Sequence, residues 1–259
     1  MGREGRKTEK SFLIDMDGVL VRGNQLIPGA DTFIERLKEG GHKFLIFTNN
    51  SERTAGDLEH RLVKIGLKVT SDHIYTSAQA TARFLASQIP RGTAFVIGES
   101  GLIEALHDEG YIISENHPDY VVVGDTHYYD HLRITQAIRL ILKGTRFIAT
   151  NPDVTGPSET GIVPATGALV ALIQKATGKP AYFVGKPNPL MMRGGLHRLN
   201  EHSENAVIVG DRMDTDIVAG IESGMETILV LTGVTRREDV EHFPYRPTQV
   251  VESVKDIEL

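Results

Sequence analysis

The chain alternates short, continuous apolar runs with longer segments of helical period, and this alternation restricts the fold more than any other feature. The predicted strands, rich in Val, Ile and Phe, are residues 11–15, 43–48, 94–98, 120–124, 146–150, 206–210 and 227–231. Most of them are apolar at nearly every position, which is typical of strands covered by helices on both faces. The predicted helices between them are residues 30–40, 52–65, 77–88, 130–142, 168–176 and 214–222. The pattern therefore predicts an α/β fold with βαβ units and a parallel sheet.

The middle of the chain has a strand–helix series of its own, which indicates an inserted lobe. Hinge-like composition lies near both of its ends, as QIPRG at 88–92 and TGKP at 177–180. The predicted parts are a solvated, disordered tail over residues 1–10, a core domain over 11–77 and 182–259, and a smaller inserted α/β lobe over 78–181.

Composition excludes several classes of protein. None of the 259 residues is Cys, which excludes disulfides, thiolate zinc sites, iron–sulfur clusters and cysteine nucleophiles. The net charge of −6 argues against a broad basic face for duplex nucleic acid. No apolar run approaches the ~20 residues that cross a bilayer, and the start, MGREGRKTEK, lacks the apolar middle of a signal peptide. We expect a cytoplasmic protein that binds neither nucleic acid nor a membrane; a homo-oligomer is compatible with the sequence.

Polar side chains follow four of the apolar runs. They are Asp15 and Asp17 after the first run, Thr48-Asn49-Asn50-Ser51 after the second, Lys186 after the short run YFVG, and Asp211, Asp214 and Asp216 after AVIVG. Each has an ordinary alternative explanation as a helix cap, a turn or a surface side chain. Ligands in open parallel sheets bind beyond the carboxyl ends of the strands. If the strands are neighbours in one sheet, the four groups converge on a single crevice.

The residue types in this set favour a phosphoryl site with a hard metal ion. Asp15 and Asp211 offer carboxylate oxygens, the ligands that Mg²⁺ prefers. Zinc is a poorer alternative because the chain has no Cys and no H-E-x-x-H element. Lys186 and the donors around Thr48 and Asn49 would meet an anionic oxygen group, where catalysis is mostly positioning and charge stabilisation.

The two acids after the first run suit a two-step transfer. Asp15 is placed to attack phosphorus and form an aspartyl-phosphate, which divides the reaction into two easier steps. Asp17 follows a tight turn that Gly18 makes easy. It could protonate the leaving oxygen and later take the proton from the attacking water.

These motifs resemble those of the haloacid dehalogenase-like (HAD) superfamily of hydrolases. The closer resemblance, over nearly the whole chain from about Phe12, is to the NagD-like phosphatases, which include nucleotide, p-nitrophenylphosphate, phosphoglycolate and pyridoxal-phosphate phosphatases. The segments that carry it are FTNNS (47–51), IGESGL (97–102), FIATNPD (147–153), VGKPNP (184–189) and VGDRMDTDI (209–217). The resemblance implies a Rossmann-like core, and it makes the inserted lobe a type IIA α/β cap domain.

The resemblance also implies a role for each motif residue. Asp15 would be nucleophile and Mg²⁺ ligand, and Asp17 the acid–base that also offers its main-chain carbonyl to the metal. Thr48, Asn49 and Asn50 are the candidate phosphate-binding residues, and Lys186 would neutralise the phosphate. Asp211 would complete the protein ligands of the metal. Asp216 would support the site as a neighbour or through a water, and the role of Asp214 stays open. Dehalogenases of this fold lack an acid two residues after the nucleophile, so Asp17 disfavours dehalogenation.

The loop after the run RFIAT is the candidate site that recognises the leaving alcohol. Asn151 and Asp153, with Thr166 and Gly167 as neighbours, could hydrogen-bond a sugar hydroxyl or a base edge; a Pro-containing turn with a helix cap is the alternative. The predicted function is a Mg²⁺-dependent phosphatase of small phosphate monoesters such as nucleoside monophosphates or sugar phosphates. Alternatives are a phosphomutase or phosphotransferase on the same scaffold and a non-catalytic binding protein. A nicotinamide dehydrogenase is disfavoured because the chain has no G-x-G-x-x-G.

Overall fold

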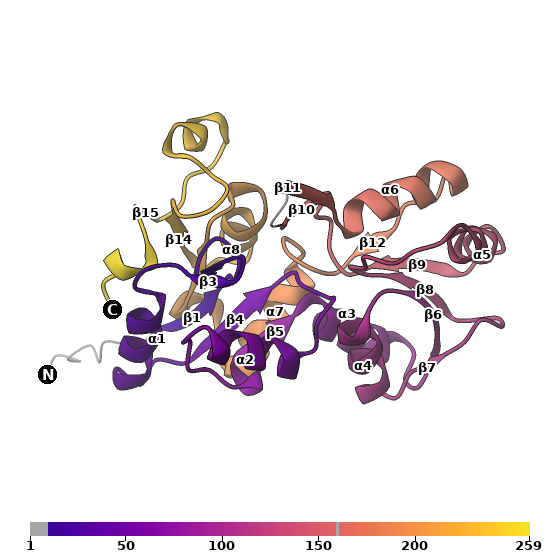
Figure 1. Ribbon diagram of the computed structural model, residues 1–259, viewed down its shortest axis with the longest axis horizontal. Helices are drawn as coiled ribbons and strands as arrows, with labels where there is room; N and C mark the ends of the chain where they lie inside the picture. Colours follow the sequence, from indigo (N-terminus) through magenta and orange to yellow (C-terminus); the bar gives the residue numbers. More distant parts are fainter. Residues whose placement is uncertain (1–9, 159–160) are drawn as a thin grey trace, which may run out of the picture. The chain divides into compact units, whose positions relative to one another are not determined.

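The computed structural model describes residues 10–158 and 161–259 (Figure 1). Within this part the chain forms two compact units. The first contains the residues up to Thr48, Glu59–Ile74 and Met192–Leu259, and the second contains Asn49–Leu58 and Tyr75–Met191. The predicted tail over residues 1–10 lies, apart from Lys10, outside the described residues. The predicted domain boundaries at 78 and 181 stay a prediction.

A six-stranded sheet is built around β1, with the strand order β15-β14-β13-β1-β4-β5. The strands are β1 (Ser11–Ile14), β4 (Phe44–Thr48), β5 (Ile74–Thr76), β13 (Ala206–Gly210), β14 (Glu226–Val230) and β15 (Gln249–Val251). β1 lies parallel to both β13 and β4, and β14 continues the parallel arrangement to β15. A short hairpin, β2 (Val21–Arg22) and β3 (Gln25–Leu26), follows β1.

Helices cover both faces of this sheet. The helices along this part of the chain are α1 (Ala30–Glu39), α2 (Ala55–Lys64), α7 (Pro189–Leu199) and α8 (Val218–Glu222), with a π-helical turn at Met213–Ile217 and short 3-10 helices at Ser71–His73, Ser203–Asn205, Arg237–His242 and Val254–Asp256. Phe12 of β1 packs its ring edge-on against Phe33 of α1. The next residue, Leu13, faces Gly195 of α7, where a Cβ atom would lie 3.2 Å from the leucine side chain. Successive residues of a strand point to opposite faces, so β1 is buried on both.

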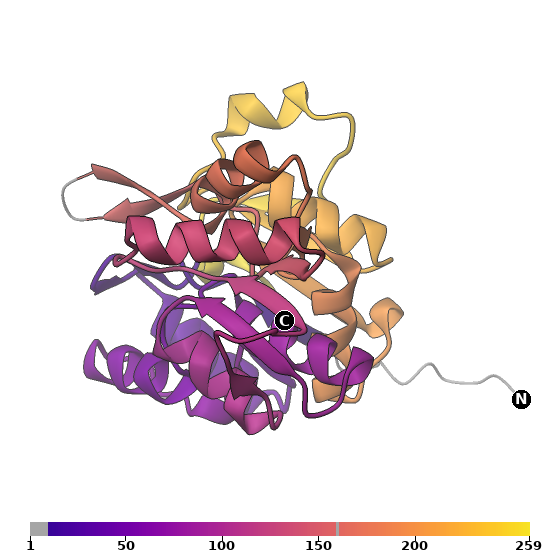
Figure 2. The same cartoon turned by 90° about the vertical axis from the view of Figure 1, so that its right-hand side faces the viewer.

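A second, five-stranded sheet has the order β12-β9-β8-β6-β7. Its strands are β6 (Thr93–Ile97), β7 (Ile112–Ile113), β8 (Tyr120–Val123), β9 (Arg146–Ala149) and β12 (Tyr182–Phe183), all paired in parallel. The accompanying helices are α3 (Ser77–Gln88), α4 (Ser100–Asp108), α5 (His131–Leu142) and α6 (Thr166–Thr177). Figures 1 and 2 show α5 and α6 on one face and α3 and α4 on the other. A hairpin of β10 (Thr155–Ser158) and β11 (Gly161–Pro164) precedes α6.

The apolar core of the second unit follows the period of its strands. Phe95 and Ile97 of β6 pack with Val121 and Val123 of β8 against α5 and α6. The residues between them in β6 and β8 are also buried, on the other face of the sheet. Strands that are apolar on both faces are typical of a parallel sheet between two helical layers.

The α/β class with parallel sheets is confirmed, and each of the seven predicted strands is present within about a residue of its predicted bounds. The last predicted helix, 214–222, is instead a π turn followed by α8. The sequence pattern did not predict α4, α7, the edge strands β5 and β15, or either hairpin. The missed strands have two to four residues, and α7 contains Gly194 and Gly195, which weaken its helical pattern. Among the described helices, none is both long and apolar enough to cross a bilayer.

Candidate active site

Three carboxylates lie together at the carboxyl ends of β1 and β13. Asp15 directly follows β1, and its N–H donates to the carbonyl of Val209 at 2.8 Å. Asp211 directly follows β13, the parallel neighbour of β1. One carboxylate oxygen from each of Asp15, Asp211 and Asp216 lies within 4.8 Å of the other two, and all three residues are buried. The first unit therefore gathers three of the predicted metal-binding acids at one point.

Glycines make room for these carboxylates. A Cβ atom at Gly210 would lie 2.1 Å from the Cβ of Asp216, and one at Gly233 would lie 1.9 Å from Oδ2 of Asp211. Gly18, at a φ of 84°, also faces Asp211, where a Cβ would lie 2.5 Å from the same oxygen. A Cβ atom essentially never lies within 3.0 Å of an atom of another residue, so a side chain at these positions would displace an acid of the group.

Main-chain donors orient the acids that follow β13. The Asp211 Oδ2 accepts from the N–H of Val234 at 2.7 Å, and the Asp216 Oδ2 accepts from the N–H of Arg212 at 3.2 Å. The π turn at Met213–Ile217 directs Asp216 into the group. Asp214 lies elsewhere: its half-exposed carboxylate accepts from Nε and Nη2 of Arg212 at 3.0 and 2.8 Å. Of these two acids, the buried group thus contains Asp216 and not Asp214.

The donor set of this group fits a small divalent cation. Carboxylates held this close repel one another when ionised, unless a cation lies among them. Buried oxygens are the ligands that Mg²⁺ and similar hard cations take. Among the described residues, this group of acids is the one whose ligand atoms are close enough for a shared ion. Asp15, Asp211 and Asp216 therefore fit a metal of this class.

Two further predicted residues follow the same edge of the sheet. Asp17 is half-buried in the turn after β1, which is closed by a hydrogen bond of 2.8 Å from the N–H of Gly18 to the carbonyl of Val21. Its carboxylate is not one of the three that lie within 4.8 Å of one another. Thr48 ends β4, the other parallel neighbour of β1, and is buried. The first unit thus contains two acids after β1 and a hydroxyl beside them on the next strand.

The remaining predicted residues belong to the second unit, where Asn49 connects two of them. Its carboxamide Oδ1 accepts from the N–H of Lys186 at 2.8 Å, and its Nδ2 donates to the Lys186 carbonyl at 3.1 Å. The same Nδ2 donates to Oδ2 of Asp153 at 2.9 Å. Lys186 is buried, and the close approach needs Gly185, where a Cβ would lie 2.7 Å from the Asn49 Oδ1. Asn49, Asp153 and Lys186 are therefore brought together.

Asn50 and Asn151 make hydrogen bonds that shape the loops. The Asn50 Oδ1 accepts from the N–H of Arg53 at 3.1 Å, as in a turn. Asn151 is buried, and its Nδ2 donates to the carbonyl of Asn49 at 3.0 Å. The first unit thus contains Asp15, Asp17, Thr48, Asp211 and Asp216, and the second contains Asn49, Asn50, Asn151, Asp153 and Lys186. Convergence of the two sets on one crevice stays a prediction.

Asp125, which the sequence pattern did not single out, accepts five hydrogen bonds in the second unit. They come from the N–H and hydroxyl of Ser51, the Nδ2 of Asn151, and the N–H and hydroxyl of Thr166. Asp125 follows the predicted strand 120–124 directly. The rule that singled out the other polar residues, a polar side chain at the end of a buried strand, would also have found this one.

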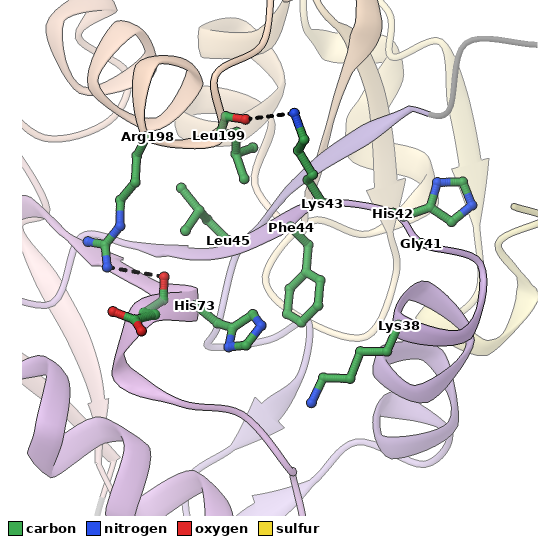
Figure 3. A pocket seen from close by; sticks show the side chains of 10 residues that line it. Lys38, Gly41, His42, Lys43, Phe44, Leu45, His73, Arg198 and Leu199 are labelled. Carbon is green, nitrogen blue, oxygen red and sulfur yellow. Dashed lines mark hydrogen bonds between the residues drawn. The ribbon is translucent and has the colours of Figure 1, made fainter.

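A hollow in the first unit is lined by none of the predicted site residues. Its volume is about 560 Å³ and its walls include Lys38, Lys43, His73 and Arg198 (Figure 3). Lys43 donates to the carbonyl of Leu199, the last residue of α7, at 3.1 Å, and it pairs with Glu201. Nη2 of Arg198 donates to the carbonyl of Asp72 at 3.1 Å. Since the carboxyl end of a helix carries unsatisfied carbonyls and partial negative charge, the end of α7 explains the position of Lys43.

Two family models match the chain. A model of haloacid dehalogenase-like hydrolases matches residues 12–112, and a HAD-hydrolase-like model matches residues 183–257.

Similar proteins cover almost all of the chain. The dihydroxyacetone phosphatase of Corynebacterium glutamicum is 51% identical, over 95% of this chain and 90% of that protein. The ribonucleotide monophosphatase NagD of Escherichia coli is 41% identical, over 97% and 99% of the two chains. The solved structure of NagD from E. coli superimposes with a TM-score of 0.92 over 97% of this chain and 99% of that one. A p-nitrophenyl phosphatase from Archaeoglobus fulgidus gives a TM-score of 0.90 at 39% identity, covering 96% and 97%.

Proposed function

The chain belongs to the haloacid dehalogenase-like hydrolases and is a phosphoric monoester hydrolase, and we propose that Asp15 is its nucleophile and Mg²⁺ its cofactor. The observation that carries this proposal is the buried group of Asp15, Asp211 and Asp216 at the end of the central strand. Ligands bind at this edge of open parallel sheets. A nucleophile beside a cation can attack an anionic phosphate that it would otherwise repel.

The proposed metal ligands are Asp15, Asp211 and the main-chain carbonyl of Asp17. Asp216 supports them, directly or through a water. Mg²⁺ would neutralise phosphate charge and orient the phosphoryl group toward Asp15. The hydrogen bond from the Val234 N–H fixes one oxygen of Asp211. The orientation of this carboxylate is therefore fixed before the metal binds.

The proposed reaction has two steps that use the same pair of acids. In the first, a carboxylate oxygen of Asp15 forms a bond to phosphorus while the bond to the leaving oxygen breaks, and Asp17 gives its proton to that oxygen. In the second, Asp17 takes a proton from a water whose oxygen attacks phosphorus, and the bond to Asp15 breaks. The products are an alcohol and inorganic phosphate, and both acids return to their first state. An acid–base in this role typically contributes ~10²–10⁴-fold.

Thr48, Asn49 and Lys186 are the proposed phosphate ligands. The carboxamide of Asn49 already bonds the main chain of Lys186 and the carboxylate of Asp153. We therefore propose that the main-chain N–H of Asn49 donates to the phosphate and that the side chain of Asn49 positions Lys186. The Lys186 ammonium and the Thr48 hydroxyl complete the proposed set, and Asn50 closes the turn that follows.

The proposed substrates are small phosphate monoesters, nucleoside monophosphates or sugar phosphates. The relatives carry names of this kind: dihydroxyacetone phosphatase, ribonucleotide monophosphatase, 5′-nucleotidase and acid sugar phosphatase. We propose that residues 78–181 act as a cap that excludes bulk water from the reacting phosphate. In this cap Asp153 would read the leaving alcohol, and the buried Asn151 would hold the loop.

A panel of phosphate esters tests the proposal. Purified protein with Mg²⁺ is incubated with p-nitrophenyl phosphate, nucleoside monophosphates, dihydroxyacetone phosphate and other sugar phosphates, and free phosphate is measured. We expect release from p-nitrophenyl phosphate and from at least one natural ester. Transfer of phosphate to an added sugar without release would instead make the protein a phosphotransferase. Absence of both reactions would leave a binding protein.

A further inference from the structure

A buried polar network surrounds the carboxylate of Asp125. Its Oδ2 accepts from the N–H and Oγ of Ser51 at 3.1 and 2.9 Å and from Nδ2 of Asn151 at 3.2 Å. Its Oδ1 accepts from the N–H and Oγ1 of Thr166 at 3.3 and 2.5 Å. Its own N–H donates to the Ser51 Oγ at 2.8 Å. Ser51, Asn151 and Thr166 are each no more than 1% exposed.

This network ties three segments of the second unit to one carboxylate. They are the segment after Asn49, the loop after β9 and the first residue of α6. Two donors hold the carbonyl of Asn49 itself: Nδ2 of Asn151 at 3.0 Å and Oγ of Ser77 at 2.6 Å. Asp125 is therefore connected to the main chain of Asn49 in two ways. It bonds Ser51, two residues further along the chain, and it bonds Asn151, which itself donates to the Asn49 carbonyl.

A second aspartate in the same unit has the same local geometry in another place. Asp119 accepts from the N–H and Oγ1 of Thr93 at 2.8 and 2.9 Å, and its own N–H donates to that hydroxyl at 3.1 Å. Asp119 precedes β8, whereas Asp125 follows it. The two pairs differ in what else they hold: the Asp125 carboxylate also bonds Asn151 and Thr166. Asp119 and Thr93 thus make the same hydrogen bonds to each other as Asp125 and Ser51 do, but without the connection to Asn49.

We propose that Asp125 is a positioning residue for phosphate binding, an inference that rests on the proposed function of the Asn49 segment. An ionised carboxylate accepts all five hydrogen bonds and makes them stronger than bonds to a neutral acceptor. Fixed in this way, the N–H and the side chain of Asn49 are oriented before phosphate arrives. Displacement of such groups by about 1 Å costs up to ~10²-fold in rate. Asp125 itself touches no reacting atom in this assignment.

The variant Asp125→Asn keeps the shape of the side chain and removes its charge. One of its polar atoms becomes an NH₂ donor that faces the N–H donors of Ser51 or Thr166, so the network rearranges. The measurements are kcat and KM for p-nitrophenyl phosphate, the dissociation constant for inorganic phosphate by calorimetry, and the thermal midpoint. We expect KM and the phosphate dissociation constant to rise and kcat/KM to fall by up to about 10²-fold.

Asp119→Asn is the matched control. It removes the same charge from the same kind of pair, and we expect a lower thermal midpoint with an unchanged dissociation constant for phosphate. If both variants lower the midpoint and neither changes phosphate binding, Asp125 has a structural role alone and the inference is wrong. If Asp125→Asn does not fold, Ser51→Ala removes the hydroxyl of the pair, and the same rise in the phosphate dissociation constant is expected.

The outcome separates this inference from the proposed function. Phosphate binding is measured without turnover, so a wild-type protein that binds phosphate and hydrolyses nothing would contradict the proposed function while the role of Asp125 is still decided. A wild-type enzyme that hydrolyses esters, paired with an Asp125→Asn variant of unchanged phosphate affinity, would contradict the inference alone.

Discussion

Side chains of opposite charge lie at the carboxyl ends and at the amino ends of the strands in the six-stranded sheet, and the reasons differ. At the carboxyl edge, Asp15, Asp211 and Asp216 are buried together, so like charges lie within a few ångströms. At the amino edge of β4, Lys43 and Arg198 line a hollow of about 560 Å³ (Figure 3) and donate to main-chain carbonyls beside them. Lys43 stabilises the carboxyl end of α7, whereas carboxylates this close repel one another when they are ionised. Under the proposed function, the reactive end of the sheet is the one where like charges are buried together, and the hollow at the other end takes no part in the reaction.

The comparison is tested most severely by removing the charge of the proposed nucleophile. Asp15→Asn should reduce turnover of p-nitrophenyl phosphate by about 10⁴-fold or more, because an amide oxygen is a far weaker nucleophile. The circular dichroism spectrum should not change. Asp214→Asn is the control, since this acid is half-exposed and pairs with Arg212 outside the buried group. Substantial turnover in Asp15→Asn would contradict the assignment of the reactive edge.

A second test concerns the metal. Asp216→Asn should raise the Mg²⁺ concentration for half-maximal activity by about 10- to 100-fold, the usual cost of losing an outer-shell partner of a metal. The activity of the wild type should vanish in EDTA and return with Mg²⁺. An Asp216→Asn enzyme with the wild-type Mg²⁺ dependence would remove this residue from the metal site.

Substitution of a glycine beside the acids should have a smaller effect on the protein, and its cause is steric. Gly210→Ala places a Cβ 2.1 Å from that of Asp216, and such overpacking costs about 1–3 kcal/mol of unfolding free energy. We expect a loss of Mg²⁺ affinity along with the loss of stability, measured by urea unfolding and by Mg²⁺ titration. Gly56→Ala, in a helix with 3.7 Å to its nearest neighbour, should be neutral or slightly stabilising. A fully active, stable Gly210→Ala would contradict the packing described for Asp216.

At the amino edge, substitutions should affect stability and leave catalysis alone. Lys43→Met removes the donor to the last carbonyl of α7 and the ion pair with Glu201. The expected loss is about 0.3–1 kcal/mol of unfolding free energy, with kcat and KM unchanged. A change in KM for phosphate esters would show that this hollow takes part in the reaction.

The smallest effect is a dependence on pH. Burial, and next the charge of Lys38, lower the pKa of His73 below its ordinary value of 6.5. The unfolded chain therefore binds this proton more readily, and the free energy of unfolding contributed by His73 falls as the pH drops below that value. His73→Gln removes the titrating group, so its stability should fall less between about pH 7.5 and pH 5.5. Identical losses in the two proteins would contradict the assignment.

The sequence was sufficient to predict the strands and the polar residues that follow them. The strands are predictable because each is a continuous apolar run, and Asp15, Thr48 and Asp211 because each ends such a run. The short edge strands and hairpins were not predictable, since two to four residues carry too little periodicity. Asp125 also ends an apolar run, so the same rule would have found it. Its hydrogen bonds to Ser51 and Thr166, which lie 74 and 41 residues away in sequence, could not be predicted from the sequence.

By itself, the sequence determined the α/β class, the strands and the acids that follow them, because burial and the polar ends of strands are local in the chain. Only the tertiary structure decided between Asp214 and Asp216, since their spacing suits either and the π turn directs one of them inward. Only the tertiary structure, too, assigned the side chain of Asn49 to Lys186 and Asp153. Hydrogen-bond partners far apart in sequence depend on packing that no local pattern encodes.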